Sequence, residues 1–86
     1  MRRLAALAFF VLCACNGIPQ SEECAQYLTC VDAIMPGASS SFVGSYGENG
    51  TCWSTDRRSA DNCTAACVQG RQLLASGLGR GQAACQ

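Results

Sequence analysis

The sequence predicts a small, disulfide-rich, mainly α-helical domain over residues 21–86: a two-helix antiparallel hairpin with a long Gly/Ser loop. Two segments place apolar residues at helical spacing, and each begins beside a side chain suited to cap a helix. Cysteines recur along both segments and beyond them, which is typical of a small domain held by disulfides. A stretch rich in Gly and Ser joins the two segments.

The first helix is expected to follow Ser21, a good N-cap. Glu22 and Glu23 then fall in the first turn, where the helix dipole favours acidic side chains. An apolar stripe continues at helical spacing through Cys24, Tyr27, Leu28, Val31, Ile34 and Met35. Pro36-Gly37 predicts the end of the helix, because proline cannot continue it.

Residues 36–58 are rich in Gly, Ser, Thr and Asn, with Phe42, Tyr46 and Trp53 among them. This stretch is either a long loop or a small β-hairpin, since Asn49-Gly50 is a strong turn signal between residues 43–46 and 51–54. Long structureless loops are uncommon in compact domains. We therefore expect the aromatic residues and a cysteine to hold the stretch against the helices.

The second helix is expected to begin near Ser59 or Asp61 and to stop at Gly77. Its apolar side carries Cys63, Ala66, Cys67, Gly70, Leu73 and Leu74. Residues 78–86 are Gly-rich and irregular, and Cys85 is placed to return this tail to the domain.

At the start of the chain, Arg2 and Arg3 precede nine uninterrupted apolar residues, too short a run to span a bilayer, and the run ends in Leu12-Cys13-Ala14-Cys15. This arrangement resembles a bacterial lipoprotein signal peptide. The resemblance implies that residues 1–14 are the signal peptide and that Cys15 carries a lipid. Residues 15–20 would then form a lipidated tether on the periplasmic or cell-surface side of a bacterial membrane. A secreted product is the alternative.

The predicted signal peptide assigns two of the eight cysteines of the chain, because Cys13 would be removed with it and Cys15 would carry the lipid. Three disulfides are expected among the six that remain, which are Cys24, Cys30, Cys52, Cys63, Cys67 and Cys85. Six cysteines allow fifteen connectivities, and the sequence does not select one. Antiparallel helices favour the set that joins Cys30 to Cys67, Cys52 to Cys63 and Cys24 to Cys85.

The sequence lacks the residues on which several classes of function depend. Histidine and lysine are absent, so no Cys-His or Ser-His nucleophile and no histidine metal ligand is available. Without Arg2 and Arg3 the net charge changes from zero to −2, and Arg57-Arg58 is the only basic pair left, so nucleic acid is not an expected partner. Cys63 and Cys67 could form half of a metal or redox site, but disulfides are the favoured interpretation. We expect neither an enzyme nor a bound cofactor or metal.

Phe42, Tyr46 and Trp53 are the candidate binding residues, with packing over the helices as the alternative. Along the chain, the cysteines and aromatic residues follow a pattern made of Cys24, Tyr27 and Cys30, then Tyr46-Gly47, Cys52-Trp53, and Cys63 with Cys67. This pattern resembles small cysteine-rich bacterial surface lipoproteins of unassigned function. The resemblance implies a fold type and no catalytic activity.

These observations lead to one functional hypothesis and one alternative. The hypothesis is a non-enzymatic, lipid-anchored envelope or surface protein that is structural or binds an envelope or extracellular protein. The alternative is a secreted inhibitor or toxin-like effector that acts through residues 39–54. The oligomeric state is left open.

Overall fold

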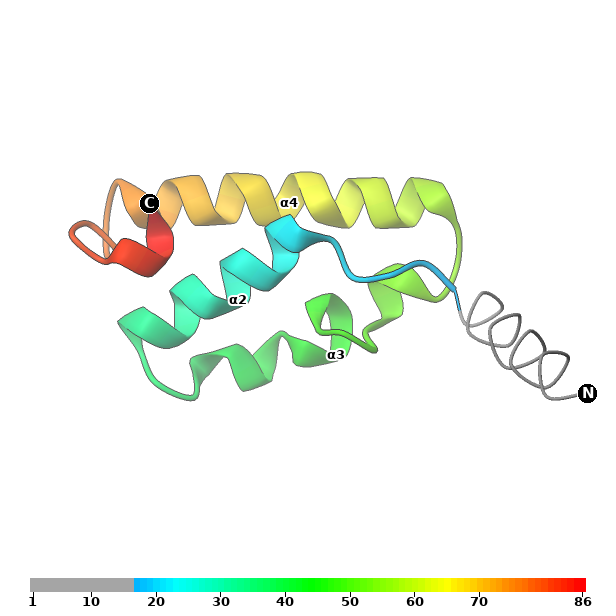
Figure 1. Cartoon of the computed structure of the whole chain (residues 1–86), viewed down its shortest axis with the longest axis horizontal. Helices are drawn as coiled ribbons and strands as arrows, with labels where there is room; N and C mark the ends of the chain where they lie inside the picture. Colours follow the sequence, from blue (N-terminus) through cyan, green and yellow to red (C-terminus); the bar gives the residue numbers. More distant parts are fainter. Residues whose placement is uncertain (1–16) are drawn as a thin grey trace, which may run out of the picture.

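Two long helices form the frame of the protein in the computed structural model, which describes residues 17–86 (Figure 1). The helical elements are, in order, α2 (Glu22–Ile34), the 3₁₀ helix η1 (Ala38–Ser41), α3 (Val43–Tyr46), the 3₁₀ helix η2 (Thr51–Trp53), α4 (Arg57–Ala75) and the 3₁₀ helix η3 (Ala83–Cys85). The mainly α-helical prediction is confirmed, and residues 17–86 contain no β-strand. The predicted signal peptide and Cys15 lie outside the described residues. No helix within 17–86 is long and apolar enough to cross a membrane.

The first long helix, α2, begins where the sequence predicts. The hydroxyl of Ser21 accepts a hydrogen bond from the backbone N–H of Cys24 at 3.3 Å, which satisfies one of the free donors at the helix start. Met35 is extended, with φ −141° and ψ 99°. This conformation is expected of a residue that precedes proline. Pro36 therefore ends the helix at Ile34, one residue before Met35, the last residue of the predicted apolar stripe.

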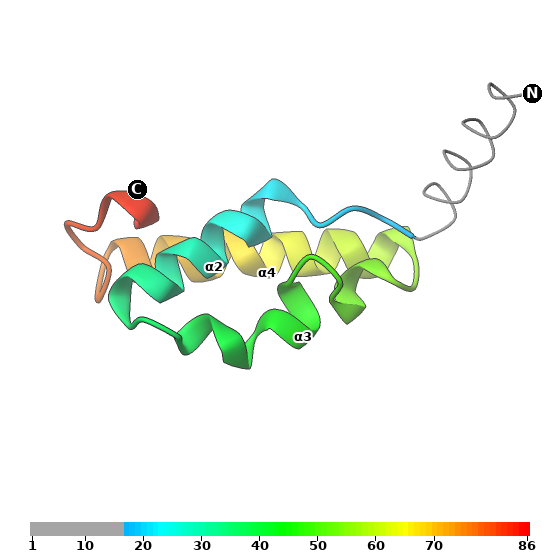
Figure 2. The same ribbon diagram turned by 60° about the horizontal axis from the view of Figure 1, so that its bottom comes forward.

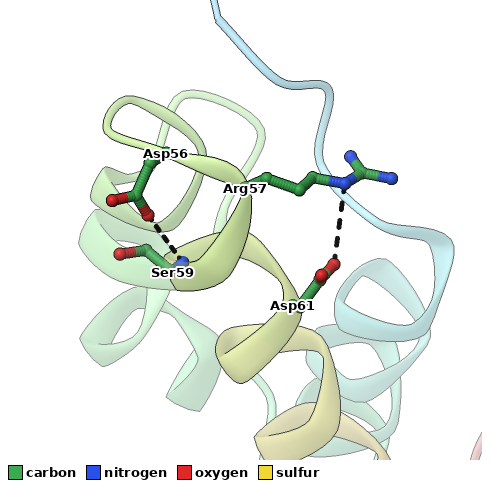
Figure 3. Close-up of polar contacts among 4 residues, drawn as sticks. All are labelled: Asp56, Arg57, Ser59 and Asp61. Atoms are coloured by element: carbon green, nitrogen blue, oxygen red, sulfur yellow. Dashed lines mark hydrogen bonds and ion pairs between the residues drawn. The ribbon is translucent and has the colours of Figure 1, made fainter.

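The second long helix, α4, begins two to four residues before the predicted start. Its N-cap is Asp56, whose Oδ1 accepts a hydrogen bond from the backbone N–H of Ser59 at 2.8 Å (Figure 3). Arg57 and Asp61 form an exposed ion pair one turn apart, with 3.7 Å between Nε and Oδ1. An exposed pair of this kind contributes little to stability, so the aspartate cap is the main determinant of the helix start.

The two long helices lie side by side and run in the same direction, so the predicted antiparallel hairpin is wrong (Figures 1 and 2). Cys24 of α2 is bonded to Cys67 of α4, and one turn further along both helices Tyr27 packs against Gly70. Residues that follow one another along α2 therefore contact residues that follow one another in the same order along α4, as in parallel helices. The long connection between them makes this possible, because it runs back along the molecule before α4 begins (Figure 2).

The connection contains α3, η1 and η2 in place of the β-hairpin considered from the sequence. The backbone N–H groups of Tyr46 and Gly47 bond to the carbonyls four residues earlier, which winds one helical turn at α3. Cys52 and Trp53 are adjacent and both buried. In a strand such neighbours would point to opposite faces, whereas the turn of η2 directs both into the core.

All six cysteines between residues 17 and 86 are bridged, as the sequence predicts. The pairs are Cys24–Cys67, Cys30–Cys85 and Cys52–Cys63, with Cα–Cα distances of 5.0, 4.7 and 6.0 Å. The Cys52–Cys63 pairing is as expected. The expected Cys30–Cys67 and Cys24–Cys85 pairings are wrong, because parallel helices exchange the two partners.

The core is small and consists largely of these cysteines. Trp53 and Ala60 complete its buried centre, and Ile18, Tyr27 and Tyr46 pack around it. Since a small domain buries too little apolar surface to offset its loss of conformational entropy, the bridges supply part of the stability that larger cores obtain from packing.

Residues 17–20, the described part of the predicted tether, lie against the domain. The backbone N–H of Ile18 donates to the carbonyl of Trp53 at 3.0 Å, and the side-chain amide of Gln20 donates to the carbonyl of Tyr46 at 2.9 Å. Gly17 has φ +101°, and a Cβ there would meet the Trp53 carbonyl oxygen at 2.8 Å. This position therefore requires glycine.

Candidate functional site: an apolar groove

The three candidate binding residues have different environments. Trp53 is 3% exposed, and its indole N–H donates to the carbonyl of Gly47 at 2.8 Å. It is a core residue, as the packing alternative described. Tyr46 is half-buried against the core, whereas Phe42 remains 36% exposed. Of the three, only Phe42 and part of Tyr46 are therefore accessible to solvent.

Phe42 and Tyr46 meet a third aromatic residue, Tyr27 of α2. The centroid of the Tyr27 ring lies 6.0 Å from each of the other two rings, and Phe42 and Tyr46 are 6.5 Å apart. The Tyr27 and Tyr46 rings are nearly perpendicular, an arrangement that aromatic pairs favour. The cluster packs the connection onto α2, and two of its members, Tyr27 and Phe42, line a groove.

The groove lies between the end of α2, η1 and the end of α4, and has a volume of about 200 Å³. It is lined by Tyr27, Val31, Ile34, Met35, Ala38, Phe42, Leu74 and Leu78. Val31 is buried, while Met35 and Leu78 are 64% and 80% exposed. Pockets for small molecules usually measure roughly 300–1,000 Å³, so this groove is smaller than most of them.

Asp32 positions the η1 side of the groove. Its carboxylate accepts hydrogen bonds from the backbone N–H of Ser39 at 3.0 Å and from the Ser39 hydroxyl at 2.8 Å. These bonds from Ser39 lower the pKa of Asp32, because they stabilise the ionised carboxylate. Since Ser39 is the neighbour of Ala38 in η1, the contact holds this short helix beside α2.

The sequence contains only part of the signal for this groove. It predicts the apolar stripe of α2, but it places Leu78 in an irregular tail. Two patterns could have indicated an exposed face: the stripe runs on to Met35 at the very end of α2, and Leu73 and Leu74 are adjacent, so that both cannot face α2. Leu73 is in fact 74% exposed, and Leu74 lines the groove.

The chemistry of the described residues centres on apolar contact. Cys63 and Cys67 bond to different partners, Cys52 and Cys24, so neither is a thiol in this state. Residues 17–86 contain no buried charged or polar side chain and no cluster of potential metal ligands. Residues 39–54, the segment of the alternative hypothesis, contact α2 and α4 through their short helices.

The chain matches no protein-family model, no curated protein and no solved structure. The basis for a functional proposal is therefore the groove, the docked residues 17–20 and the cysteine framework. The groove lies where α2 and α4 end, whereas the segment that precedes α2 extends toward the opposite end of the molecule, where α4 begins (Figure 1).

Proposed function

We propose that this chain is an exported, lipid-anchored, non-enzymatic module that binds an envelope or cell-surface protein in its apolar groove. The lipid anchor rests on the resemblance of residues 1–15 to a lipoprotein signal peptide. Three disulfides support an oxidising compartment, because such bonds persist there and are rare in reducing ones.

One observation carries the binding role. Met35 and Leu78 expose most of their apolar surface at the rim of a groove whose floor, Val31, is already buried. Exposed apolar side chains gathered around a concave site mark protein contacts more often than scattered ones do. Methionine adapts its shape to a partner, and the Phe42 ring offers a flat apolar wall.

The partner that fits this site presents one protruding aliphatic or aromatic side chain, carried on a helix or a turn. The groove is too small for a large ligand and offers mainly apolar atoms. We expect affinity to come from burial of that side chain, at about 25 cal/mol for each Å² of apolar area removed from water.

Site-specific photo-crosslinking in intact cells tests the binding role. A photoreactive residue at position 78 is expected to give a discrete crosslinked product with an envelope protein. The same residue at position 73 is the matched control, because Leu73 is an equally exposed leucine of α4 that does not line the groove. Equal products from both positions, or a product that persists when Met35→Glu is added, would contradict the proposal.

The intact mass of the native protein tests whether the chain is exported, cleaved and attached to lipid. The expected mass begins at Cys15, includes acyl chains and lacks six hydrogens for the three disulfides. A mass that retains residues 1–14, or one that begins at Cys15 without acyl chains, would contradict the lipid anchor while leaving the groove intact.

A further inference from the structure

We propose that the membrane-facing surface of this protein is the end that carries η2 and the first turn of α4. The groove then faces away from the bilayer. This inference rests on the lipid anchor of the proposed function, and it concerns how the docked residues 17–20 position the domain on the lipid headgroups.

The docked segment is attached to a rigid part of the fold. Ile18 is hydrogen-bonded through its backbone N–H to the carbonyl of Trp53, and its side chain packs against the core. Trp53 is itself buried and bonded to Gly47, and its neighbour Cys52 is bridged to Cys63 of α4. The chain at residue 18 therefore moves with the domain.

The distance from this segment to the lipid is short. Only Asn16 separates Cys15 from Gly17, so the two Cα atoms are at most about 7 Å apart in an extended chain. The headgroup layer on each side of a bilayer core is roughly 5–7 Å thick. A lipid on Cys15 consequently holds Gly17, and the Trp53 carbonyl beside it, at the level of the headgroups.

The direction of the chain places the groove far from this point. Residues 17–20 run along α4 from its first turn toward the start of α2 in both views (Figures 1 and 2). Followed in reverse, the chain leaves the domain at the end where α4 begins. Leu74 lies 17 residues further along α4 than Arg57, a distance of about 25 Å at 1.5 Å per residue.

The composition of this end fits a polar headgroup layer. Glu48, Asp56, Arg57, Arg58 and Asp61 are exposed, and their charges sum to only −1. The large exposed apolar side chains of the described residues are Met35, Phe42, Val43, Leu73 and Leu78, and none of these lies between residues 44 and 72. The surface can rest on zwitterionic headgroups without repulsion and without inserting, while the lipid supplies the attachment.

Paramagnetic broadening of amide signals tests this orientation on the full lipidated protein. The probe is a phosphatidylcholine nanodisc in which a small fraction of lipids carries a gadolinium-chelating headgroup. We expect amides of residues 48–58 to lose several-fold more intensity than amides of residues 74–82. Equal broadening of the two ranges would overturn the proposal, because the domain would then lie flat or tumble freely.

Two variants separate docking from tether length. A Gly/Ser insertion of about ten residues before Gly17 adds a reach of roughly 17 Å and is expected to abolish the difference between the ranges. Gly17→Val keeps the length, but its Cβ meets the Trp53 carbonyl, so it is expected to weaken the difference as well. An unchanged pattern in both variants would contradict an orientation set by the docked segment.

The two proposals can fail independently. If the intact mass shows no acyl chains and the protein does not bind the nanodiscs, the lipid anchor fails before orientation is measured. If the acylated protein binds and broadens evenly, the anchor stands and the orientation is wrong.

Discussion

At the scale of single residues, Trp53 connects three parts of the molecule. Its ring fills the core, its indole N–H bonds to Gly47, and its backbone carbonyl receives the N–H of Ile18. A buried tryptophan usually has a partner for its N–H, because an unpaired donor is costly away from water. One residue thus joins the connection, the core and the N-terminal segment.

We expect Trp53→Phe to lower the free energy of unfolding by about 1–3 kcal/mol, because it keeps an aromatic ring but leaves the Gly47 carbonyl without its donor. Urea denaturation followed by far-ultraviolet circular dichroism measures the change. Leu73→Ala is the control, since this side chain is 74% exposed and is expected to alter stability much less. In the natural protein, acrylamide should quench Trp53 fluorescence weakly, and strong quenching would contradict its burial.

Asp56 gives the protein a defined sensitivity to acid. The backbone N–H of Ser59, and then its side chain, lower the pKa of Asp56 by bonding to the carboxylate. A lowered pKa in the fold means that the stabilisation is complete above the ordinary value for aspartate and is lost as the pH falls through the lowered value. The pKa of Asp32 is also lowered, by the hydrogen bonds from Ser39, so its contribution to stability is lost in acid as well.

We therefore expect Asp56→Ala to destabilise the protein at neutral pH and to show a smaller deficit in strong acid, where the natural carboxyl is protonated. Asp56→Asn should stay close to the natural protein at neutral pH, because asparagine caps helices about as well. Denaturant titrations at several pH values between 2 and 7 provide the comparison. A deficit of Asp56→Ala that is the same at both extremes would show that the charge of the cap has no role.

At the scale of elements, the close approach of α2 and α4 depends on Gly70. A Cβ at this position would lie 2.7 Å from Cε1 of Tyr27, so the ring occupies the space that a side chain would need. The ring is also held by Phe42 and Tyr46, which limits its freedom to move.

We expect Gly70→Ala to destabilise the protein by about 1–3 kcal/mol through overpacking, although alanine is the better helix former. Gly44→Ala in α3 is the matched control, because nothing lies within 4 Å of a Cβ there and its φ is not positive. That substitution should be neutral or slightly stabilising. If the two alanines had the same effect on the urea midpoint, the packing of Tyr27 on Gly70 would be contradicted.

The existence of both long helices could be predicted because periodic apolar stripes and caps are local signals. Ser21 and Pro36 bound α2 in sequence as they do in the structure. The direction of α4 relative to α2 could not be predicted in this way. It depends on the path of the connection, residues 35–56, which returns to the end of the molecule where α2 begins before α4 starts (Figure 2). The β-hairpin that was one alternative at Asn49-Gly50 does not form, because residues 51–53 wind into η2, which directs both Cys52 and Trp53 into the core.

The sequence predicts which residues are apolar in the candidate site better than it predicts where the site lies. Its helical spacing places Tyr27, Val31, Ile34 and Leu74 on the apolar sides of two helices. These residues line one groove only because the two helices are parallel. Phe42 was a candidate contact and lies on the groove, whereas Trp53 belongs to the core. Residue type therefore identifies apolar surface, and only the fold separates what is covered from what stays exposed.

At the scale of the whole molecule, three bridges connect α2, α4, η2 and η3. Cys24–Cys67 joins the long helices, Cys30–Cys85 joins α2 to η3, and Cys52–Cys63 joins η2 to α4. The separations are 43, 55 and 11 residues. Because a longer closed loop restricts the unfolded chain more, the first two bridges should contribute more than the third.

We expect alanine replacement of both Cys24 and Cys67 to cost about 4 kcal/mol, and replacement of both Cys52 and Cys63 about 3 kcal/mol, from loop entropy alone. Thermal unfolding of the two double variants under oxidising conditions measures the order. A larger loss for the short loop would show that the Cys52–Cys63 bridge acts mainly through the packing of Trp53.

The connectivity itself is testable by peptide mapping without reduction. Chymotryptic cleavage after Tyr27 or Leu28 separates Cys24 from Cys30, and tryptic cleavage after Arg80 isolates Cys85. The peptide with Cys85 should be linked to the one with Cys30. A link between Cys85 and Cys24 would restore the antiparallel arrangement and overturn the parallel register.

The Cys24–Cys67 bridge also determines how the molecule bears mechanical tension. If a partner in the groove pulls against a lipid on Cys15, the load enters at Gly17 and reaches Cys24 seven residues later. There the bridge carries the load directly into α4. Tension can peel away only residues 17–23, about 25 Å of extended chain, before it meets a covalent bond. Beyond that point both walls of the groove would be pulled together as one unit.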